Sequence, residues 1–332
     1  MLRLILLTAA IALGAGGVYF YSNYDVEIHC DYKGKLEYVR VVPKGQQGRT
    51  ATGAAAAGPE AKPVRIATLN LGLLEEKRWE TPKISSLLVK LLSQFDVVAL
   101  QDVRARNQGP IVRLLGKLNV EGRKYNFATS PYVRTGDVQQ YSAFLFDAAR
   151  IEIDRGTVQM VEDPQRRFSH PPLVALFRVR GPDEKEAFTF KLINVHTEPQ
   201  RAAQETELLD DVYRAVRDDR PLEDDIILLG DFGTVTDRIE SLKQIPDLGP
   251  SIADTPTTFR SNATVDNIFF NRRATIEFTG RAEVFDVERD LGLEPQEAQA
   301  MFEHLPVWAE FSPYEGGDAG PVAARNDRAI RF

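Results

Sequence analysis

The stretch IILLGDFGTVT, residues 226–236, decides how the fold of this chain is interpreted. Four apolar residues lead through a glycine to Asp231, and small residues follow the acid. A buried strand that ends in an acid and then turns is typical of a sheet that presents a catalytic side chain at its edge. Two residues later the chain has Gly233, where a catalytic loop is expected to carry a side chain. The stretch therefore predicts a buried central strand and an unusual site beside it.

The composition is that of a globular protein with few ligands for soft metals. The chain has 332 residues, of which 43% are hydrophobic and 27% charged, and its net charge of −7 argues against a broad basic surface for nucleic acid. Cys30 is the only cysteine and four histidines are present, so a cysteine zinc site is excluded. We therefore expect hard, oxygen-ligated cations, namely Mg²⁺ or Mn²⁺, with Ca²⁺ as an alternative.

The N-terminal residues 1–22 place Arg3 before an apolar run that reaches Tyr21. An anchor needs roughly 17–25 apolar residues, whereas the small residues at positions 12–17 would suit a signal-peptide cleavage site. Because aromatic residues continue past the glycines to an interfacial position, we favour an uncleaved signal anchor over a cleaved signal peptide. Both interpretations predict that the rest of the chain is exported from the cytoplasm.

Three further segments follow along the chain. Residues 23–62 combine a short stretch of β character, KLEYVRVV at 35–42, with a Gly-, Ala- and Pro-rich stretch that indicates a flexible linker. Residues 63–314 form the predicted catalytic domain, and residues 315–332 form a polar C-terminal tail. Within the domain, helices are predicted at 81–95 and 200–218. Strands outnumber helices, which favours an α/β fold with two mixed sheets covered by helices.

Polar side chains recur at the ends of the apolar strands. Each one alone has a structural explanation, such as a turn or a helix end. Together, carboxylates, an amide and imidazoles at strand ends make up the set of groups that metal-assisted phosphodiester hydrolysis requires. In chain order they are Asn70, Asp102, His196, Asp231, Asp266 and the pair Glu303 and His304.

Over most of residues 64–312 the sequence resembles the endonuclease/exonuclease/phosphatase superfamily, and within it the pancreatic-type deoxyribonuclease branch. The resemblance rests on segments in the family's order: IATLNL, VVALQDVR, YSAFLFD, INVHTEP, ILLGDF, ADTPTTFRSNATVDNIFF and EHLPVWAEF. It implies a four-layer α/β/β/α sandwich of two packed mixed sheets, with the site at one edge. It also implies nucleic acid or another phosphodiester as the substrate, and it implies no protein partner.

The resemblance also implies roles for individual residues. Asn70 and Asp102 would form the principal metal site, and Asp231 would orient the attacking water or a metal. His304, hydrogen-bonded to Asp266, would be the general base. His196 would act as a general acid or stabilise the developing charge. The remaining implied residues are Glu303 as a metal ligand and Arg104, Tyr141, His170 and Gly233 as substrate-binding positions.

The sequence departs from the family's pattern at four positions near the site. Asp102 stands where the family has the longer Glu, and Glu303 stands where Asp is usual. Gly233 replaces the Asn whose amide contacts the phosphate, and His170 replaces a substrate-contacting Arg of the deoxyribonuclease branch. Glycine offers no side-chain donor, so we expect slow cleavage and a gain of about tenfold from Gly233→Asn.

Three interpretations remain open. The first is an active, divalent-metal-dependent phosphodiesterase with an altered site, working as an endonuclease. The second is a phosphatase or phosphodiesterase acting on a lipid or sugar phosphate, and the third is a non-catalytic interaction module of the same fold. Because both histidines of the site, Asp231 and Asp266 are all present, we favour the first.

Overall fold

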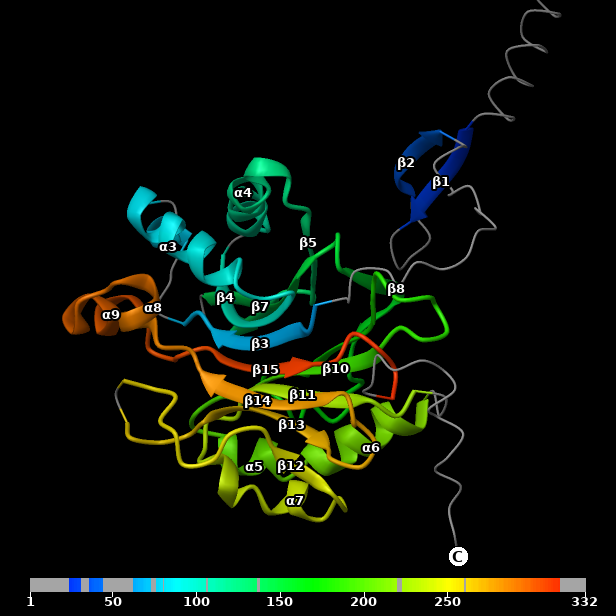
Figure 1. Ribbon diagram of the computed structural model, residues 1–332. Helices are drawn as coiled ribbons and strands as arrows, with labels where there is room; N and C mark the ends of the chain where they lie inside the picture. The colour runs from blue at the N-terminus through cyan, green and yellow to red at the C-terminus, as the bar shows by residue number, and fades with distance from the viewer. Residues whose placement is uncertain are drawn as a thin grey trace, which may run out of the picture. The chain divides into compact units, whose positions relative to one another are not determined.

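The computed structural model describes residues 24–30, 36–43, 62–72, 76–79, 81–105, 107–135, 138–219, 223–259 and 261–316 (Figure 1). The chain divides into two units, residues 1–58 and 59–332. In the first unit, strand β1 (Tyr24–Cys30) pairs antiparallel with β2 (Leu36–Pro43), which lies where the sequence predicted β character. None of the described helices is long and apolar enough to cross a membrane. The predicted anchor at 1–22 lies outside the described residues.

The described part of the second unit contains two mixed sheets. The seven-stranded sheet has the order β14-β15-β3-β4-β7-β5 with β6 paired to β7, and the six-stranded sheet has the order β12-β13-β11-β10-β9-β8. The strands of the seven-stranded sheet are β3 (Val64–Asn70), β4 (Val97–Arg104), β5 (Tyr125–Thr129), β6 (Val133–Thr135), β7 (Val138–Asp147), β14 (Phe278–Val284) and β15 (Val307–Phe311). Those of the six-stranded sheet are β8 (Ile151–Met160), β9 (Leu173–Val179), β10 (Thr189–His196), β11 (Ile226–Asp231), β12 (Leu248–Pro250) and β13 (Asp266–Asn271).

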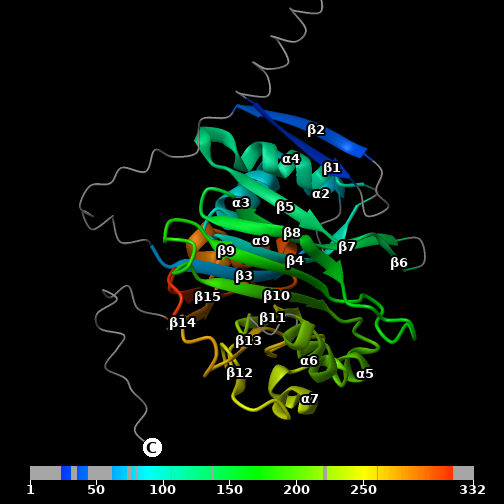
Figure 2. The same ribbon diagram turned by 90° about the vertical axis from the view of Figure 1, so that its right-hand side faces the viewer.

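Helices cover the outer face of each sheet, which gives four layers (Figures 1 and 2). The helices over the seven-stranded sheet are α3 (Pro82–Leu92), α4 (Gly109–Leu118), α8 (Val287–Leu291) and α9 (Pro295–Met301), with the short α2 (Glu76–Trp79) and the 3₁₀ turn η1 (Val120–Gly122) nearby. Those on the side of the six-stranded sheet are α5 (Ala202–Thr206), α6 (Leu209–Asp219) and α7 (Glu240–Lys243), with the 3₁₀ turn η2 (Thr236–Arg238). The predicted four-layer α/β/β/α sandwich is confirmed.

One core lies between the two sheets and is built from aromatic and branched side chains. Phe144 of β7 and Phe177 of β9 meet edge to face with their ring centroids 5.3 Å apart. All six residues of β11 are buried, as are the last seven residues of β10. Such strands are sandwiched on both faces, so their sequences are continuous apolar runs instead of alternating patterns. The hydrophobic effect of this burial fixes which strands are central.

One predicted helix is wrong in its extent. The sequence predicted a single helix over 200–218, whereas the structure has α5 and α6 separated by a turn at 207–208. The fully buried carboxylate of Glu205 accepts hydrogen bonds from the backbone N–H groups of Ser169 and Glu198, which ties α5 to two loops. Helix α6 instead packs its apolar face on the six-stranded sheet. Helices α5 and α6 therefore pack against different parts of the protein, which is why the chain turns between them.

Candidate active site

Six strands deliver polar side chains to one edge of the sandwich. The parallel pairs β3–β4 and β10–β11 end there, and β13 and β15 begin there because they run antiparallel to β11 and β3. In the register of the six-stranded sheet, His196 lies opposite Asp231, and Asp231 lies opposite Asp266. Three predicted residues from separate segments thus occupy adjacent positions across the strands. The carboxyl ends of sheet strands are where open α/β sheets place their ligands.

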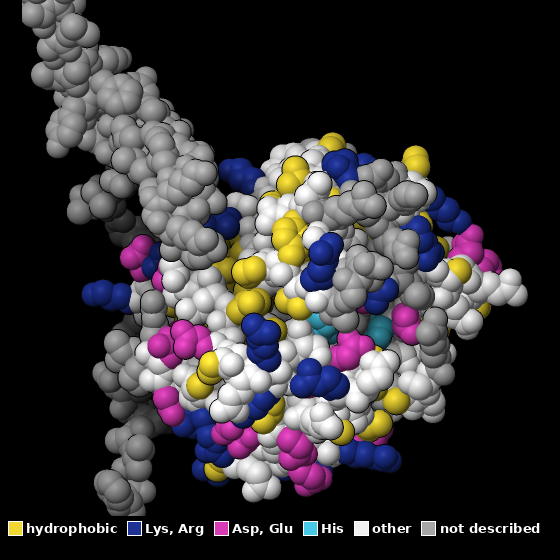
Figure 3. All heavy atoms as spheres, turned by 180° about the vertical axis from the view of Figure 1, so that it is seen from behind, with side chains coloured by type: hydrophobic (Ala, Val, Ile, Leu, Met, Phe, Trp, Pro, Cys, Tyr) yellow, Lys and Arg dark blue, Asp and Glu magenta, His cyan; other side chains and the backbone are white. Residues whose placement is uncertain are grey.

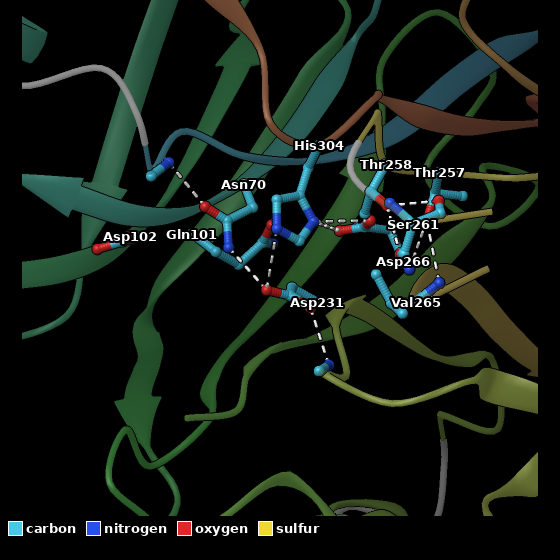
Figure 4. Close-up of polar contacts among 12 residues, drawn as sticks. Asn70, Gln101, Asp102, Asp231, Thr257, Thr258, Ser261, Val265, Asp266 and His304 are labelled. Atoms are coloured by element: carbon cyan, nitrogen blue, oxygen red, sulfur yellow. Dashed lines mark hydrogen bonds and ion pairs between the residues drawn. The ribbon is translucent and has the colours of Figure 1, made fainter. Parts of the chain in front are cut away.

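A continuous line of polar contacts runs through the centre of this edge (Figure 4). Nδ1 of His304 lies 2.9 Å from Oδ2 of Asp266, and Nε2 of the same ring lies 3.8 Å from Oδ2 of Asp231. Asn70 donates from Nδ2 to Oδ2 of Asp231 at 2.7 Å. Each of these side chains is largely buried. The structure therefore brings together four residues that the sequence predicted for the site.

Thr257 holds this line of contacts in place, although the sequence predicted no role for it. Its Oγ1 accepts hydrogen bonds from the backbone N–H groups of Val265 and Asp266, each at 3.0 Å. Its carbonyl oxygen accepts the N–H of Leu305, the residue after His304, at 2.7 Å. One residue thus fixes the backbone of both partners in the His304–Asp266 pair. The only sequence signal was its place in the motif ADTPTTFRSNATVDNIFF.

Asp102 reaches the site through an irregularity in β4. The register between β4 and β7 shifts between Leu100 and Val103, and Asp102 has a φ of +51°. A β-bulge of this kind turns a side chain in a direction that a regular strand does not allow. A Cβ added at Gly72 would lie 2.8 Å from Oδ2 of Asp102 and 3.1 Å from Oδ1 of Asn70, so both oxygens lie over this glycine. The bulge is how the shorter acid reaches the edge.

Arg104 pairs directly with Asp102. Nε and Nη2 of the guanidinium lie 2.8 and 2.7 Å from the two carboxylate oxygens, a bidentate arrangement. The arginine is 42% exposed, whereas the carboxylate is only 5% exposed. Arg104 thus neutralises the acid that was predicted to bind metal and still reaches solvent beside it.

The second imidazole of the site lies against another histidine. The rings of His196 and His170 stack with centroids 4.8 Å apart and planes 14° apart. Gln140 Nε2 contacts the His170 ring nitrogens, and the carboxylate of Glu198 lies 3.7 Å from its Nε2. His170 is only 6% exposed. It therefore packs against the His196 ring and offers little surface to a substrate. Tyr141 is also buried, with its ring 5.2 Å from that of Tyr132.

The pKa values of the two predicted catalytic imidazoles shift in opposite directions. Burial disfavours charge on His304, but Asp266, Asp231 and Glu303 outweigh it and raise the pKa of the ring to about 9. Burial lowers the pKa of His196 to about 3, with the attraction of Asp231 too weak to compensate. Without a bound cation, His304 is therefore charged near neutral pH and His196 is neutral.

The donors at this edge fit a hard divalent cation. Burial raises the pKa of Asp102 against the opposing effect of Arg104, and burial together with Asp266 raises that of Asp231. Buried carboxylates of this kind are stabilised by a cation. Candidate ligand atoms of Asp231, Asp266 and His304 all lie within 4.8 Å of one another. Among the described residues Glu303 is not a member of that cluster, although its charge acts on His304.

Gly233 has a structural reason to lack a side chain. Its backbone N–H donates to Oδ1 of Asp231 at 2.8 Å, and its φ is +61°, in the left-handed region. A Cβ at this position would lie 2.6 Å from Oγ1 of Thr197 and 2.9 Å from Cβ of Ala202. The space that a side chain would need is therefore filled by the segments after His196.

The same edge is accessible from outside. In Figure 3, histidine side chains reach the surface beside acidic side chains, and Lys and Arg side chains are scattered over the same face. Among the described residues on this face, the Lys and Arg side chains do not join into one continuous surface around the histidines.

The fold is thus an α/β/β/α sandwich, and its candidate site combines imidazoles and carboxylates at the shared edge of the two sheets. Residues 67–287 match the model of the Endonuclease/Exonuclease/phosphatase family, and the chain belongs to this family. The predicted family is thereby confirmed.

Curated relatives and solved structures agree with this assignment. The chain is 28% identical over 265 residues to deoxyribonuclease-1 of Sus scrofa, covering 74% of this chain and 90% of that protein. It is 26% identical over 283 residues to deoxyribonuclease-1-like 2 of Homo sapiens, covering 76% and 92%. An endonuclease/exonuclease/phosphatase structure from Bacteroides vulgatus matches with a TM-score of 0.52 at 14% identity, covering 75% of this chain and 98% of that one. The deoxyribonuclease-like branch is thus supported by sequence, and the fold by structure.

Proposed function

We propose that this chain is a divalent-metal-dependent phosphodiesterase that cleaves nucleic acid as an endonuclease. The observation that carries the proposal is the line of contacts from Asp266 through His304 and Asp231 to Asn70. A carboxylate behind an imidazole fixes its tautomer and stabilises its charged form, which is the arrangement a general base requires. The similarity to deoxyribonuclease-1 over most of that protein's length supports the choice of substrate.

The cation-binding residues in this proposal are Asn70 and Asp102, with Asp231 beside them. Their oxygens suit Mg²⁺ or Mn²⁺, with Ca²⁺ as the alternative, and Glu303 stays a predicted metal ligand in this proposal. When bound, such a cation would neutralise the phosphate and, by opposing the imidazolium charge, lower the pKa of His304.

The chain's own residues then move the protons. His304 accepts a proton from the attacking water while Asp266 stabilises the resulting imidazolium, and Asp231 orients the water. As the new phosphorus–oxygen bond forms, the bond to the leaving oxygen breaks. His196 is neutral, so it acts as a hydrogen-bond donor to the developing charge more readily than as a charged acid. Arg104, paired with Asp102 and 42% exposed, is the proposed cationic contact to the phosphate.

The N-terminal sequence also supports a proposal about where in the cell the protein acts. We propose that the catalytic domain is exported and held at a membrane by residues 1–22, or secreted after signal cleavage. Protease treatment of intact cells, with any outer barrier permeabilised, should then degrade the domain. A domain that stays intact under these conditions would refute the export proposal.

A metal-dependent cleavage assay tests the enzymatic proposal. We expect full-length protein to nick plasmid DNA with Mg²⁺ or Mn²⁺, and excess chelator to stop it. His304→Ala and Asp231→Ala should each remove nearly all activity, while Glu184→Gln, at an exposed glutamate, should retain it. Full activity in chelator, or in His304→Ala, would refute the mechanism.

One observation favours a second substrate class. His170 is buried where a substrate-contacting arginine was expected, and Arg104 is already paired with Asp102. A smaller phosphoester, such as a lipid or sugar phosphate, would need fewer cationic contacts than a nucleic acid backbone. Comparison of plasmid DNA with bis(p-nitrophenyl) phosphate separates the possibilities: turnover of the small ester alone would support the second class. A folded protein that turns over neither would indicate a non-catalytic module.

A further inference from the structure

A cluster of carboxylates lies at the end of the sandwich opposite to the candidate active site. Asp225 immediately precedes β11, whose other end is Asp231, and six residues of strand span about 20 Å. Glu277 immediately precedes β14, at the edge where β14 begins, β15 ends and β3 starts. Glu315 follows β15. The cluster is therefore separate from the site that Asn70 and Asp231 mark.

The carboxylates of this cluster are close together and shielded from water. Ligand oxygens of Asp225, Glu277 and Glu315 lie within 4.8 Å of one another, and Glu223 and Asp224 form a second such group with Asp225. Asp225 and Glu277 are each 1% exposed. In the part of the chain that the structure describes, neither of these two acids forms an ion pair with Lys or Arg. Several carboxylates are thus buried close together, and the two most buried ones, Asp225 and Glu277, have no Lys or Arg partner among the described residues.

Backbone amides fix one carboxylate oxygen of Glu277 and one of Glu315. Gly316 donates its N–H to Oε1 of Glu277 at 2.6 Å, and Thr189 donates to Oε2 of Glu315 at 3.3 Å. Oε2 of Glu277 and Oδ1 of Asp225 are buried and have no hydrogen-bond partner among the described residues. Two buried carboxylate oxygens are therefore held in position without a donor.

Burying these carboxylates together costs free energy of folding unless their charge is neutralised. A buried carboxylate without a partner loses its hydration, and a second carboxylate beside it adds repulsion. The deficit can be met by protons or by a cation that uses the free oxygens as ligands. The hydroxyl of Thr275 is 1% exposed and interacts with the Asp225 carboxyl, so it offers another oxygen beside the two acids.

We propose that Asp225, Glu277 and Glu315 bind a Ca²⁺ ion that fastens the two sheets together at this end. Asp225 immediately precedes β11 of the six-stranded sheet, whereas Glu277 immediately precedes β14 and Glu315 follows β15 in the seven-stranded sheet. Ca²⁺ accepts several oxygen ligands in irregular geometry, including carboxylates and neutral oxygens, while Mg²⁺ demands a near-ideal octahedron. The ion has a structural role and is distinct from the cation of the proposed catalytic site.

The test compares the thermal stability of full-length variants in chelator and in Ca²⁺. Wild-type protein should gain roughly 5–10 °C in Tm at a Ca²⁺ concentration near 100 times the Kd. Glu277→Gln keeps the shape and the acceptor for Gly316 but removes the charge, so it should lose this gain. Its Tm in chelator should equal or exceed that of wild type, because repulsion with Asp225 is gone. Glu184→Gln, at an exposed glutamate, is the matched control and should respond like wild type.

Calorimetric titration separates this site from the catalytic one. Asp102→Asn should keep the Ca²⁺-dependent rise in Tm, whereas Glu277→Gln and Asp225→Asn should each bind one Ca²⁺ fewer than wild type. The proposal is overturned if wild-type protein shows no Ca²⁺-dependent stabilisation. It is equally overturned if Glu277→Gln responds as strongly as wild type, which would mean that the two acids simply share a proton.

Discussion

Replacing Gly233 by asparagine tests how the site has adapted to the missing amide. The φ of +61° is a conformation that Asn tolerates, so the backbone alone would accept the change. The space would not, because the new Cβ would lie 2.6 Å from Oγ1 of Thr197 and 2.9 Å from Cβ of Ala202. Contacts below 3.0 Å require one of the neighbours to move. Overpacking of this kind costs about 1–3 kcal/mol.

The expected result is a double-mutant cycle with strong coupling. Gly233→Asn alone should lower the Tm by roughly 2–12 °C, since each kcal/mol is worth about 2–4 °C in a domain of this size, and should bring no gain in rate. Thr197→Ala alone should change stability little, because its buried Oγ1 has no hydrogen-bond partner among the described residues. The double variant should recover the part of the stability that the contact with Thr197 costs, with a coupling energy of about 1 kcal/mol, while the contact with Cβ of Ala202 remains.

The assay has two readouts. Urea unfolding of the four proteins gives the coupling energy, and single-turnover cleavage of duplex DNA at saturating metal gives the rate of the chemical step. The double variant should cleave about tenfold faster than wild type, because the amide regains part of the stabilisation that a preorganised donor provides. If Gly233→Asn is as stable as wild type, or if Thr197→Ala leaves its effect unchanged, the steric reasoning is wrong. A well-folded double variant without any gain in rate would reject the account based on the missing amide.

Three further predictions concern charge and backbone. In chelator, the His304–Asp266 pair should stabilise the fold fully below about pH 6.5 and lose that effect as the pH rises through about 9, because the folded pKa lies above the ordinary value of 6.5. The loss is roughly 3 kcal/mol, and Asp266→Asn should flatten this dependence in urea unfolding; an unchanged slope would contradict it. Arg104→Gln frees the Asp102 carboxylate, so the metal concentration for half-maximal cleavage should fall about fivefold, and a rise would show that the ion pair does not compete with the cation. Gly230→Ala would place a Cβ 1.9 Å from a carbonyl oxygen of β10, so no soluble folded protein should be recovered, and a normal Tm would refute that geometry.

The sequence by itself determined the sandwich and which edge of it carries the candidate active site. Strands such as β10 and β11 are continuous apolar runs, and hydrophobic burial on both faces leaves such runs only one place in the fold. Since parallel strands end at a common edge, the polar residues that close them had to meet, as Asp231 and His196 do. These conclusions depend on local pattern and on strand geometry, which the chain carries in neighbouring residues.

Only the tertiary structure decided how the side chains at that edge are engaged. The bulge that aims Asp102, and the ion pair that Arg104 makes with it, depend on pairing with β7, a strand far along the chain. The sequence predicted that Asn would fit at position 233, and the structure shows Thr197 in that space. Asp225 and Glu277 are separated by some fifty residues, so no local pattern reveals that they meet. Contacts between distant segments depend on how the two sheets pack against each other. The periodicity of neither segment's sequence encodes that packing.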